Sequence, residues 1–175
     1  MNEPAMNQYS LMARFNAWVN EQVYECASRL PEQAYRADRK AFFGSVHRTL
    51  NHLLVVDRLW TGRIEGVDRG IRALDQVLYD DFASLRAARR KEDEDLIALV
   101  DGLGEERLGA KVRFRAITDS GTYDARAGHI LLTLFNHQTH HRGQVHALLT
   151  QAGITPPPLD LVVYLAEIGE VTRGD

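Results

Sequence analysis

The chain has 175 residues, of which 45% are hydrophobic and 26% charged, a composition typical of an ordinary globular protein with one sizeable core. Its formal net charge of −3 gives no overall basic surface for nucleic acid, and no apolar run approaches the ~20 residues that span a bilayer. The single cysteine, Cys26, excludes intrachain disulfides, and residues 1–7 lack the pattern of a secretory signal. We therefore expect one cytoplasmic domain over residues 1–175.

Four long segments with a helical spacing of apolar residues follow one another along the chain. We expect helices from Tyr9 to Leu30, from Ser45 to Arg63, from Asp80 or Asp81 to Gly102 or Gly104, and from Asp124 to Gly153. The prolines at positions 156–158 end the fourth pattern, because proline cannot continue a helix. A short fifth helix is expected after them, from Asp160 to Glu167.

Residues 111–123 lack helical spacing and instead predict a small β-hairpin between the third and fourth helices. Val112–Ile117 alternates with period two, Asp119–Gly121 offers a turn, and Thr122 and Tyr123 begin a return strand. The chain does not alternate strands with helices in the way that builds a parallel sheet. The pattern therefore predicts an all-α four-helix bundle with one small hairpin and a short C-terminal helix.

The third predicted helix carries a dense run of charged residues between Arg86 and Asp95. Because both signs occur in near-equal number, we interpret this run as a solvated helix face. Its pairs at i,i+4 are expected to be Arg90 with Glu94 and Lys91 with Asp95. A binding surface is the alternative interpretation.

The fourth predicted helix has histidines where apolar residues are expected. Its inward positions follow the spacing Ile130, Leu134, His137, His141, Gln144 and Leu148. His137 and His141 thus lie one turn apart on the same face. Imidazoles that face a bundle core are costly unless they are hydrogen-bonded or bind a ligand, so we predict a divalent metal site here. His140 is the alternative partner of His137, whereas His129 lies too far along the axis and His146 points away.

A third ligand is expected from the second predicted helix, which offers His47 and His52. The two are five residues apart, or about 140° around the axis, so they cannot both point inward. His52 falls in the apolar spacing with Thr49 and Val56, whereas His47 has polar neighbours and is interpreted as exposed. We therefore choose His52, and we place Asp57 beside the site as a hydrogen-bonding partner or on the surface.

Three neutral imidazoles suit zinc or nickel, and also iron or copper, better than calcium or magnesium, which prefer oxygen ligands. Three protein ligands leave one coordination position open, as in catalytic sites rather than structural ones. Gln144 lies on the same predicted helix face and is a candidate for orienting the occupant of that position.

Several motifs resemble those of one known family. Residues 15–20 read FNAWVN, residues 49–54 read TLNHLL, and residues 136–144 read NHQTHHRGQ. Together with the ending that runs from Gly153 to Asp160, they resemble the DinB/YfiT-like family over roughly residues 6–164. The combination of the His-x-x-x-His-Arg-Gly-Gln element with a histidine two helices earlier is fairly specific.

The resemblance implies a four-helix bundle with a long crossover and a divalent metal bound by three histidines. Carried onto this chain, the ligand positions of the family are His52, His137 and His141. Members with assigned activities are similar to thiol-dependent S-transferases and isomerases that use bacillithiol, mycothiol or glutathione, and many members have no known substrate. Members also commonly form dimers.

Two functional hypotheses follow. As an enzyme, the protein uses a metal to activate a small thiol or a water that attacks an electrophilic small molecule, as a thiol transferase or a hydrolase does. As a non-catalytic stress-response protein, it holds a metal that joins two helices, and a fourth ligand from His140 or Asp57 is then expected. The apolar succession Leu53–Val56 exceeds one bundle face and predicts a homodimer.

Overall fold

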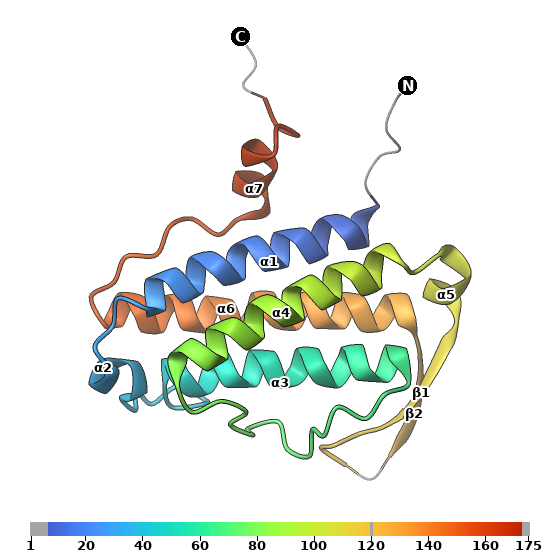
Figure 1. Ribbon diagram of the computed structural model, residues 1–175, viewed down its shortest axis with the longest axis horizontal. Helices are drawn as coiled ribbons and strands as arrows, with labels where there is room; N and C mark the ends of the chain where they lie inside the picture. The colour runs from blue at the N-terminus through green and yellow to red at the C-terminus, as the bar shows by residue number, and fades with distance from the viewer. Residues whose placement is uncertain (1–6, 120, 173–175) are drawn as a thin grey trace.

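The computed structural model describes residues 7–119 and 121–172, and its centre is a bundle of four long helices (Figure 1). These are α1 (Gln8–Ala27), α3 (Val46–Glu65), α4 (Phe82–Asp101) and α6 (Ala127–Gln151). α1 packs against α4 and α6, and α3 packs against the same two helices. α3 and α4 run in the same direction because residues 66–81 cross back along the length of the bundle (Figure 1). The predicted bundle with a long crossover is confirmed.

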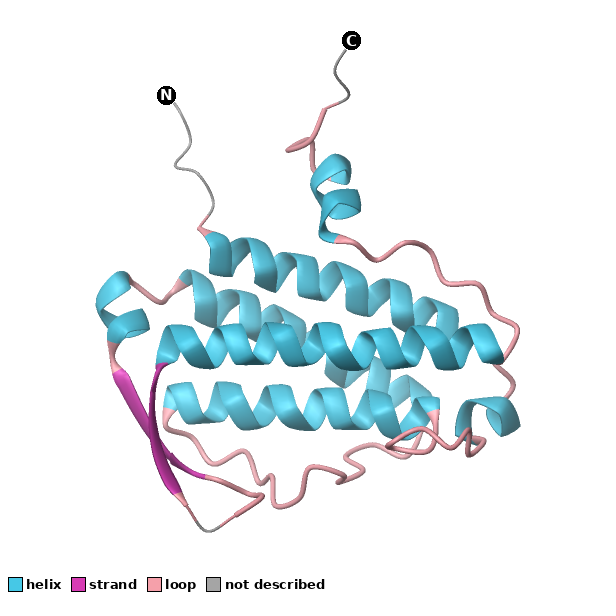
Figure 2. Cartoon of the chain, turned by 180° about the vertical axis from the view of Figure 1, so that it is seen from behind, coloured by secondary structure: helices cyan, strands magenta, loops and turns pink. Residues whose placement is uncertain are grey.

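Five shorter elements complete the described chain. They are α2 (Glu32–Arg36), α5 (Glu105–Gly109), β1 (Lys111–Arg115), β2 (Thr122–Arg126) and α7 (Leu161–Glu167). β1 and β2 form an antiparallel hairpin at one end of the bundle, and α7 stands beside α1 (Figure 2). The hairpin and the short C-terminal helix were predicted, whereas α2 and α5, of five residues each, were not.

Two predicted boundaries are wrong by three residues. The first long helix ends at Ala27 rather than at Leu30, because residues 28–30 already form a turn before Pro31. The fourth long helix begins at Ala127 rather than near Asp124, because Asp124 lies in β2 opposite Arg113. The guanidinium of Arg113 donates two hydrogen bonds of 3.0 Å to the Asp124 carboxylate, which holds that residue in the strand. Ser120, part of the predicted turn, lies outside the described residues.

Capping residues fix where the long helices begin and end. The Ser45 hydroxyl accepts a hydrogen bond from the backbone N–H of Arg48 at the start of α3, and the Asp81 carboxylate caps α4 in the same way. α3 ends at Gly66, which has a left-handed φ of 73° that glycine adopts without strain. None of the described helices is long and apolar enough to cross a membrane.

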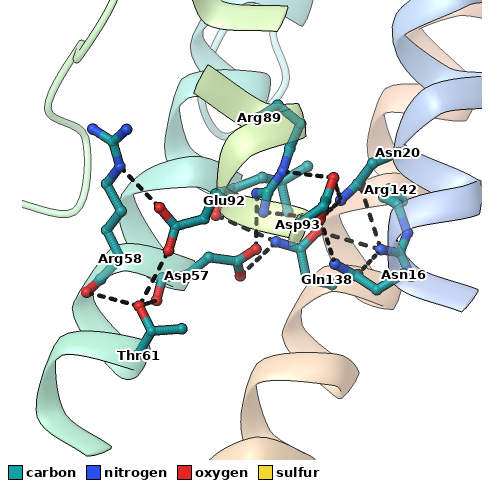
Figure 3. A network of polar contacts seen from close by, with 11 residues as sticks. Asn16, Asn20, Asp57, Arg58, Thr61, Arg89, Glu92, Asp93, Gln138 and Arg142 are labelled. Atoms are coloured by element: carbon teal, nitrogen blue, oxygen red, sulfur yellow. Dashed lines mark hydrogen bonds and ion pairs between the residues drawn. The ribbon is translucent and has the colours of Figure 1, made fainter. Parts of the chain in front are cut away.

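A layer of polar side chains crosses the bundle and draws on all four long helices (Figure 3). We call it the polar layer, and its members are Asn16, Asn20, Asp57, Arg58, Thr61, Arg89, Glu92, Asp93, Gln138 and Arg142. On α3, α4 and α6 these residues lie between the positions of one apolar cluster and those of a second. Buried polar groups are costly unless they are paired, so this layer constrains how the four helices align.

Arg89 is the centre of the polar layer. Its side chain is 2% exposed, and its guanidinium lies 2.8 Å from an oxygen of Asp57 on α3 and 3.0 Å from an oxygen of Asp93. Asp93 also accepts a hydrogen bond of 2.9 Å from Asn20 on α1. Burial raises the pKa of Asp57 to about 6, which still leaves the carboxylate largely ionised at neutral pH.

The burial of these residues corrects the interpretation of the charged run on α4. Arg89, Glu92 and Asp93 are buried, because α1 and α3 cover the helix face that carries them. Arg90 forms its ion pair with Glu21 of α1 rather than with Glu94. The expected pair of Lys91 with Asp95 is present.

Replacing Arg89 should therefore cost far more stability than replacing its exposed neighbour. In Arg89→Met, two buried carboxylates lose their cation, and we expect the free energy of unfolding to fall by about 3–5 kcal/mol. Arg90→Met removes only a surface pair and should change it little. Urea unfolding followed by circular dichroism measures both variants. Equal stability of the two would contradict a central role for Arg89.

Candidate metal centre

Three histidines from two neighbouring helices meet at one edge of the bundle. His52 comes from α3, and His137 and His141 come from α6, which packs against it. Each offers one ring nitrogen to the cluster, and these three nitrogens lie within 4.8 Å of one another. The three ring centroids are 4.3–4.9 Å apart. The structure thus brings together the three residues that the sequence pattern selected.

Hydrogen bonds on the outer side of two rings fix which nitrogen faces the cluster. The Nδ1–H of His52 donates to the carbonyl of Leu74 at 2.7 Å, in the crossover loop. The Nδ1 of His141 lies 2.8 Å from the Oε1 of Gln144, which can only accept. With Nδ1 protonated in both rings, each presents the lone pair of its Nε2 inward.

The inward nitrogens are placed where a cation stabilises them. The Nε2 atoms of His52 and His137 lie 3.1 Å apart. The other nitrogen of His137, Nδ1, is buried and has no hydrogen-bond partner among the described residues. A divalent cation between these two nitrogens would accept a lone pair from each of them, in place of a proton shared along the contact. The donor set therefore fits a metal of the kind that imidazole prefers.

Burial keeps these imidazoles neutral. It lowers the pKa of His52 to about 4 and that of His137 to about 3, and it lowers the pKa of His141 in the same direction. The neighbouring histidines lower the pKa of His137 further. A metal competes with protons for imidazole nitrogens, so a cluster that is neutral at pH 7 is ready to bind one.

A cavity of about 1000 Å³ opens onto the cluster. Its walls come from the end of α2, from the loop before α3, from α3 itself, from the crossover loop and from α6. The ring of Phe43 stacks on His52 at a centroid distance of 3.9 Å and covers one face of that imidazole. A small molecule in this cavity would therefore contact the histidines directly, and it would do so beside an aromatic surface.

Four of the six inward positions predicted on α6 are buried, namely Ile130, Leu134, His141 and Leu148, and the other two, His137 and Gln144, are half-buried. The most buried residues include Leu131, Leu134, Gln138 and Val145, each 0% exposed, whereas His137 is only half-buried. Gln138, rather than His137, faces the bundle core and joins the polar layer. His137 instead lies at the edge of the core, where it lines the cavity.

Two sequence interpretations near the site are corrected by the structure. His47 is 4% exposed rather than solvated, because its ring lies within hydrogen-bond distance, 3.2 Å, of the hydroxyl of Tyr35 on α2. Asp57 is 0% exposed and lies in the polar layer, where it accepts a hydrogen bond of 2.6 Å from Gln138. Asp57 is thus neither on the surface nor a partner of the three histidines.

The other residues that the sequence analysis considered lie either at the rim of the cavity or on other surfaces. Gln144 lines the cavity, and its Oε1 lies 2.8 Å from the Nδ1 of His141; its contact with a bound ligand stays a prediction. His140 is exposed and lies 3.2 Å from the Gln144 amide nitrogen. His129 is exposed, and His146 lines a different pocket, as its predicted direction requires. The roles of Leu74 and Phe43 were missed, since no local pattern marks a loop residue that meets His52.

The fold and the cluster define a class of protein, a helical bundle that holds three convergent histidines on two helices. The sequence profile of the DinB family matches residues 1–170, and the chain belongs to that family. It is 26% identical over 160 residues to Protein DinB of Bacillus subtilis strain 168, covering 86% of this chain and 90% of that protein. A DinB-like protein from Bacillus subtilis with a solved crystal structure has the same fold, with a TM-score of 0.63 at 18% identity. The match to that structure covers 85% of this chain and 96% of the other.

The lowered pKa of His52 predicts how metal-free protein responds to acid. The unfolded chain binds a proton at His52 near the ordinary pKa of 6.5, whereas the folded chain binds it only near 4. Burying His52 in its neutral form therefore costs no free energy of unfolding above pH 6.5. As the pH falls from 6.5 toward 4, protonation of the unfolded chain lowers the free energy of unfolding. At pH 5, His52 alone should cost about 1–2 kcal/mol of unfolding free energy.

Urea unfolding of metal-free protein at neutral pH and near pH 5 measures this loss. The His52→Gln variant lacks the titrating group and should lose less stability on acidification than the wild type. His129→Gln removes an exposed histidine and should lose as much as the wild type. An equal loss in His52→Gln and the wild type would contradict the buried, neutral state of His52.

Proposed function

We propose that the protein binds one divalent transition metal through His52, His137 and His141 and uses it to activate a small thiol or a water. The observation that carries the proposal is the convergence of three neutral imidazole nitrogens within 4.8 Å, at the wall of an open cavity. Zinc and nickel are the proposed metals, with iron and copper as alternatives. Family membership supports the proposal, because the histidines occupy the positions that the motifs indicate.

The site favours an enzyme over a closed structural centre. A structural site is normally completed by a fourth protein ligand, and none of the other described histidines, cysteines or carboxylates converges with the three. When bound, the metal would supply a positive charge that lowers the pKa of a coordinated thiol or water, so that a nucleophile forms at neutral pH. The residues of the chain orient the ligands: Leu74 holds the His52 ring, and Gln144 holds that of His141.

A thiol S-transferase-like reaction is the proposed activity, with an electrophilic small molecule as second substrate. The resemblance of the motifs to those of thiol-dependent family members supports a thiol rather than water. A metal-dependent hydrolase is the alternative enzyme, and a non-catalytic metal-binding stress-response protein is the alternative from another class.

A homodimer remains a prediction. The succession Leu53–Val56 that suggested it is buried within the chain itself, because α3 packs against two helices at once. It therefore gives no support for a dimer. Apolar side chains that stay exposed, such as Leu132 on α6 and Val162 on α7, are the remaining surfaces that an association would cover.

Metal analysis of the purified protein tests the ligand set. We expect about one divalent metal per chain in the wild type. Alanine at His52, His137 or His141 should weaken affinity more than the 10–100-fold typical of losing a residue that only hydrogen-bonds a ligand. His140→Ala is the matched control, because His140 is exposed, lies beside His141 and should keep the metal. Full metal content in any of the three ligand variants would remove that residue from the set.

Titration of the cobalt-substituted protein with small thiols tests the chemistry. A sulfur atom that reaches the metal should give a sulfur-to-cobalt charge-transfer band, because soft thiolates replace water readily on such ions. Affinity should rise with pH until the free thiol ionises, since binding releases a proton. If azide perturbs the cobalt spectrum but glutathione and cysteine do not, the thiol reading fails and activated water becomes the leading alternative.

A further inference from the structure

Of the charged residues that line the cavity, two form ion pairs with residues outside its lining, and two form none among the described residues. Four charged side chains line the cavity: Arg36, Asp38, Arg48 and Asp75. Arg36 donates to Asp80, and Asp38 forms an ion pair with Lys40. Within the described residues, Arg48 and Asp75 form no ion pair, and the Arg48 guanidinium donates no hydrogen bond. Arg48 is thus an exposed cation at the cavity wall, where a bound anion would replace the solvent around its guanidinium.

Arg48 is placed to act at the histidine cluster. It lies four residues before His52 on α3, and residues at i,i+4 share one face of a helix. The two positions are about 6 Å apart along the helix axis. Because both side chains also line the same cavity, a small molecule that contacts the histidines can carry its anionic group to Arg48.

The charge of Asp75 and the apolar ring of Phe42 indicate which class of small molecule the cavity favours. Asp75 follows Leu74, whose carbonyl holds His52, so an anion is repelled there and is favoured at Arg48. Phe42 lines the same cavity with its side chain 85% exposed and offers an apolar contact for a carbon skeleton. An organic acid fits these features better than an inorganic anion.

We infer that Arg48 is a specificity-determining residue that binds the carboxylate of a small organic thiol or substrate while its other end reaches the histidine cluster. A planar guanidinium matches a carboxylate with two parallel hydrogen bonds, which fixes the orientation of the bound molecule as well as its charge. This inference rests on the proposed function and adds the class of ligand: a carboxylate-bearing small molecule.

The test compares two thiols that differ in charge at one end. Cobalt-substituted protein is titrated with 3-mercaptopropionate and with its neutral amide, and the charge-transfer band gives two dissociation constants. Their ratio is compared between variants, so that intrinsic differences between the thiols cancel. In Arg48→Gln the ratio should shift about tenfold toward the amide, as expected for the loss of a charge-assisted hydrogen bond. The affinity for the amide should stay unchanged.

Three further variants separate a specific contact from general electrostatics. Arg48→Lys should keep part of the preference, because it keeps the charge but not the paired geometry. Asp75→Asn should not lower the preference for the carboxylate. Arg72→Gln changes an exposed arginine that is paired with Asp68 outside the cavity, and should match the wild type.

The outcomes distinguish a failure of the proposed role of Arg48 from a failure of the proposed function. An unchanged ratio in Arg48→Gln, with both thiols still bound, overturns the role of Arg48 and leaves the proposed function standing. If neither thiol perturbs the cobalt spectrum of the wild type, the thiol-based function fails and this inference fails with it. The spectrum before thiol is added, which should be the same in all variants, verifies that the metal site is intact.

Discussion

The alignment of the four helices depends on one buried arginine and the carboxylates around it. Arg89 on α4 contacts Asp57 on α3, and Asp57 in turn accepts a hydrogen bond from Gln138 on α6. Because an unpaired buried charge is costly, these contacts resist sliding of one helix along another. Gln138 directly follows His137, so the contact that aligns α3 with α6 also brings His137 to His52. The polar layer thus helps to set the geometry of the histidine cluster.

Most of the fold follows from local sequence signals. Apolar spacing marks the four long helices, Ser45 and Asp81 mark two of their starts, and Gly66 marks an end. The polar layer was not predicted from the sequence, because charged residues on a helix are ordinarily interpreted as solvated. Whether Arg89 is exposed or buried depends on which helices cover its face, and that is a property of the packed bundle. The same reason explains why the start of α6 was misplaced at Asp124, whose partner in β1 lies on another strand.

The residues of the candidate site likewise separate into those that local spacing predicts and those that only the packed structure reveals. His137 and His141 could be selected from the sequence because spacing within one helix places them on one face, and His52 because it follows the apolar pattern of α3. The burial of His47 could not be predicted, because it depends on Tyr35 in the unpredicted helix α2. The contacts of Leu74 and Phe43 with His52 were not predicted for a related reason. They reach His52 from loops, and the folded path of a loop is not encoded in a periodic pattern.

The polar layer and the histidine cluster differ in whether the chain itself supplies their partners, and this difference indicates where the function lies. In the polar layer, Arg89 lies between Asp57 and Asp93, and those carboxylates are further held by Gln138 and Asn20. Each of these charged side chains lies within 3.0 Å of an opposite charge supplied by the chain itself, which is what a structural device requires. The histidine cluster is different, because the Nε2 atoms of His52 and His137 face one another at 3.1 Å at the wall of an open cavity, and none of the described carboxylates converges with them. Groups that converge at a cavity are accessible to a ligand from outside the chain, so the function is to be sought at the cavity rather than in the core.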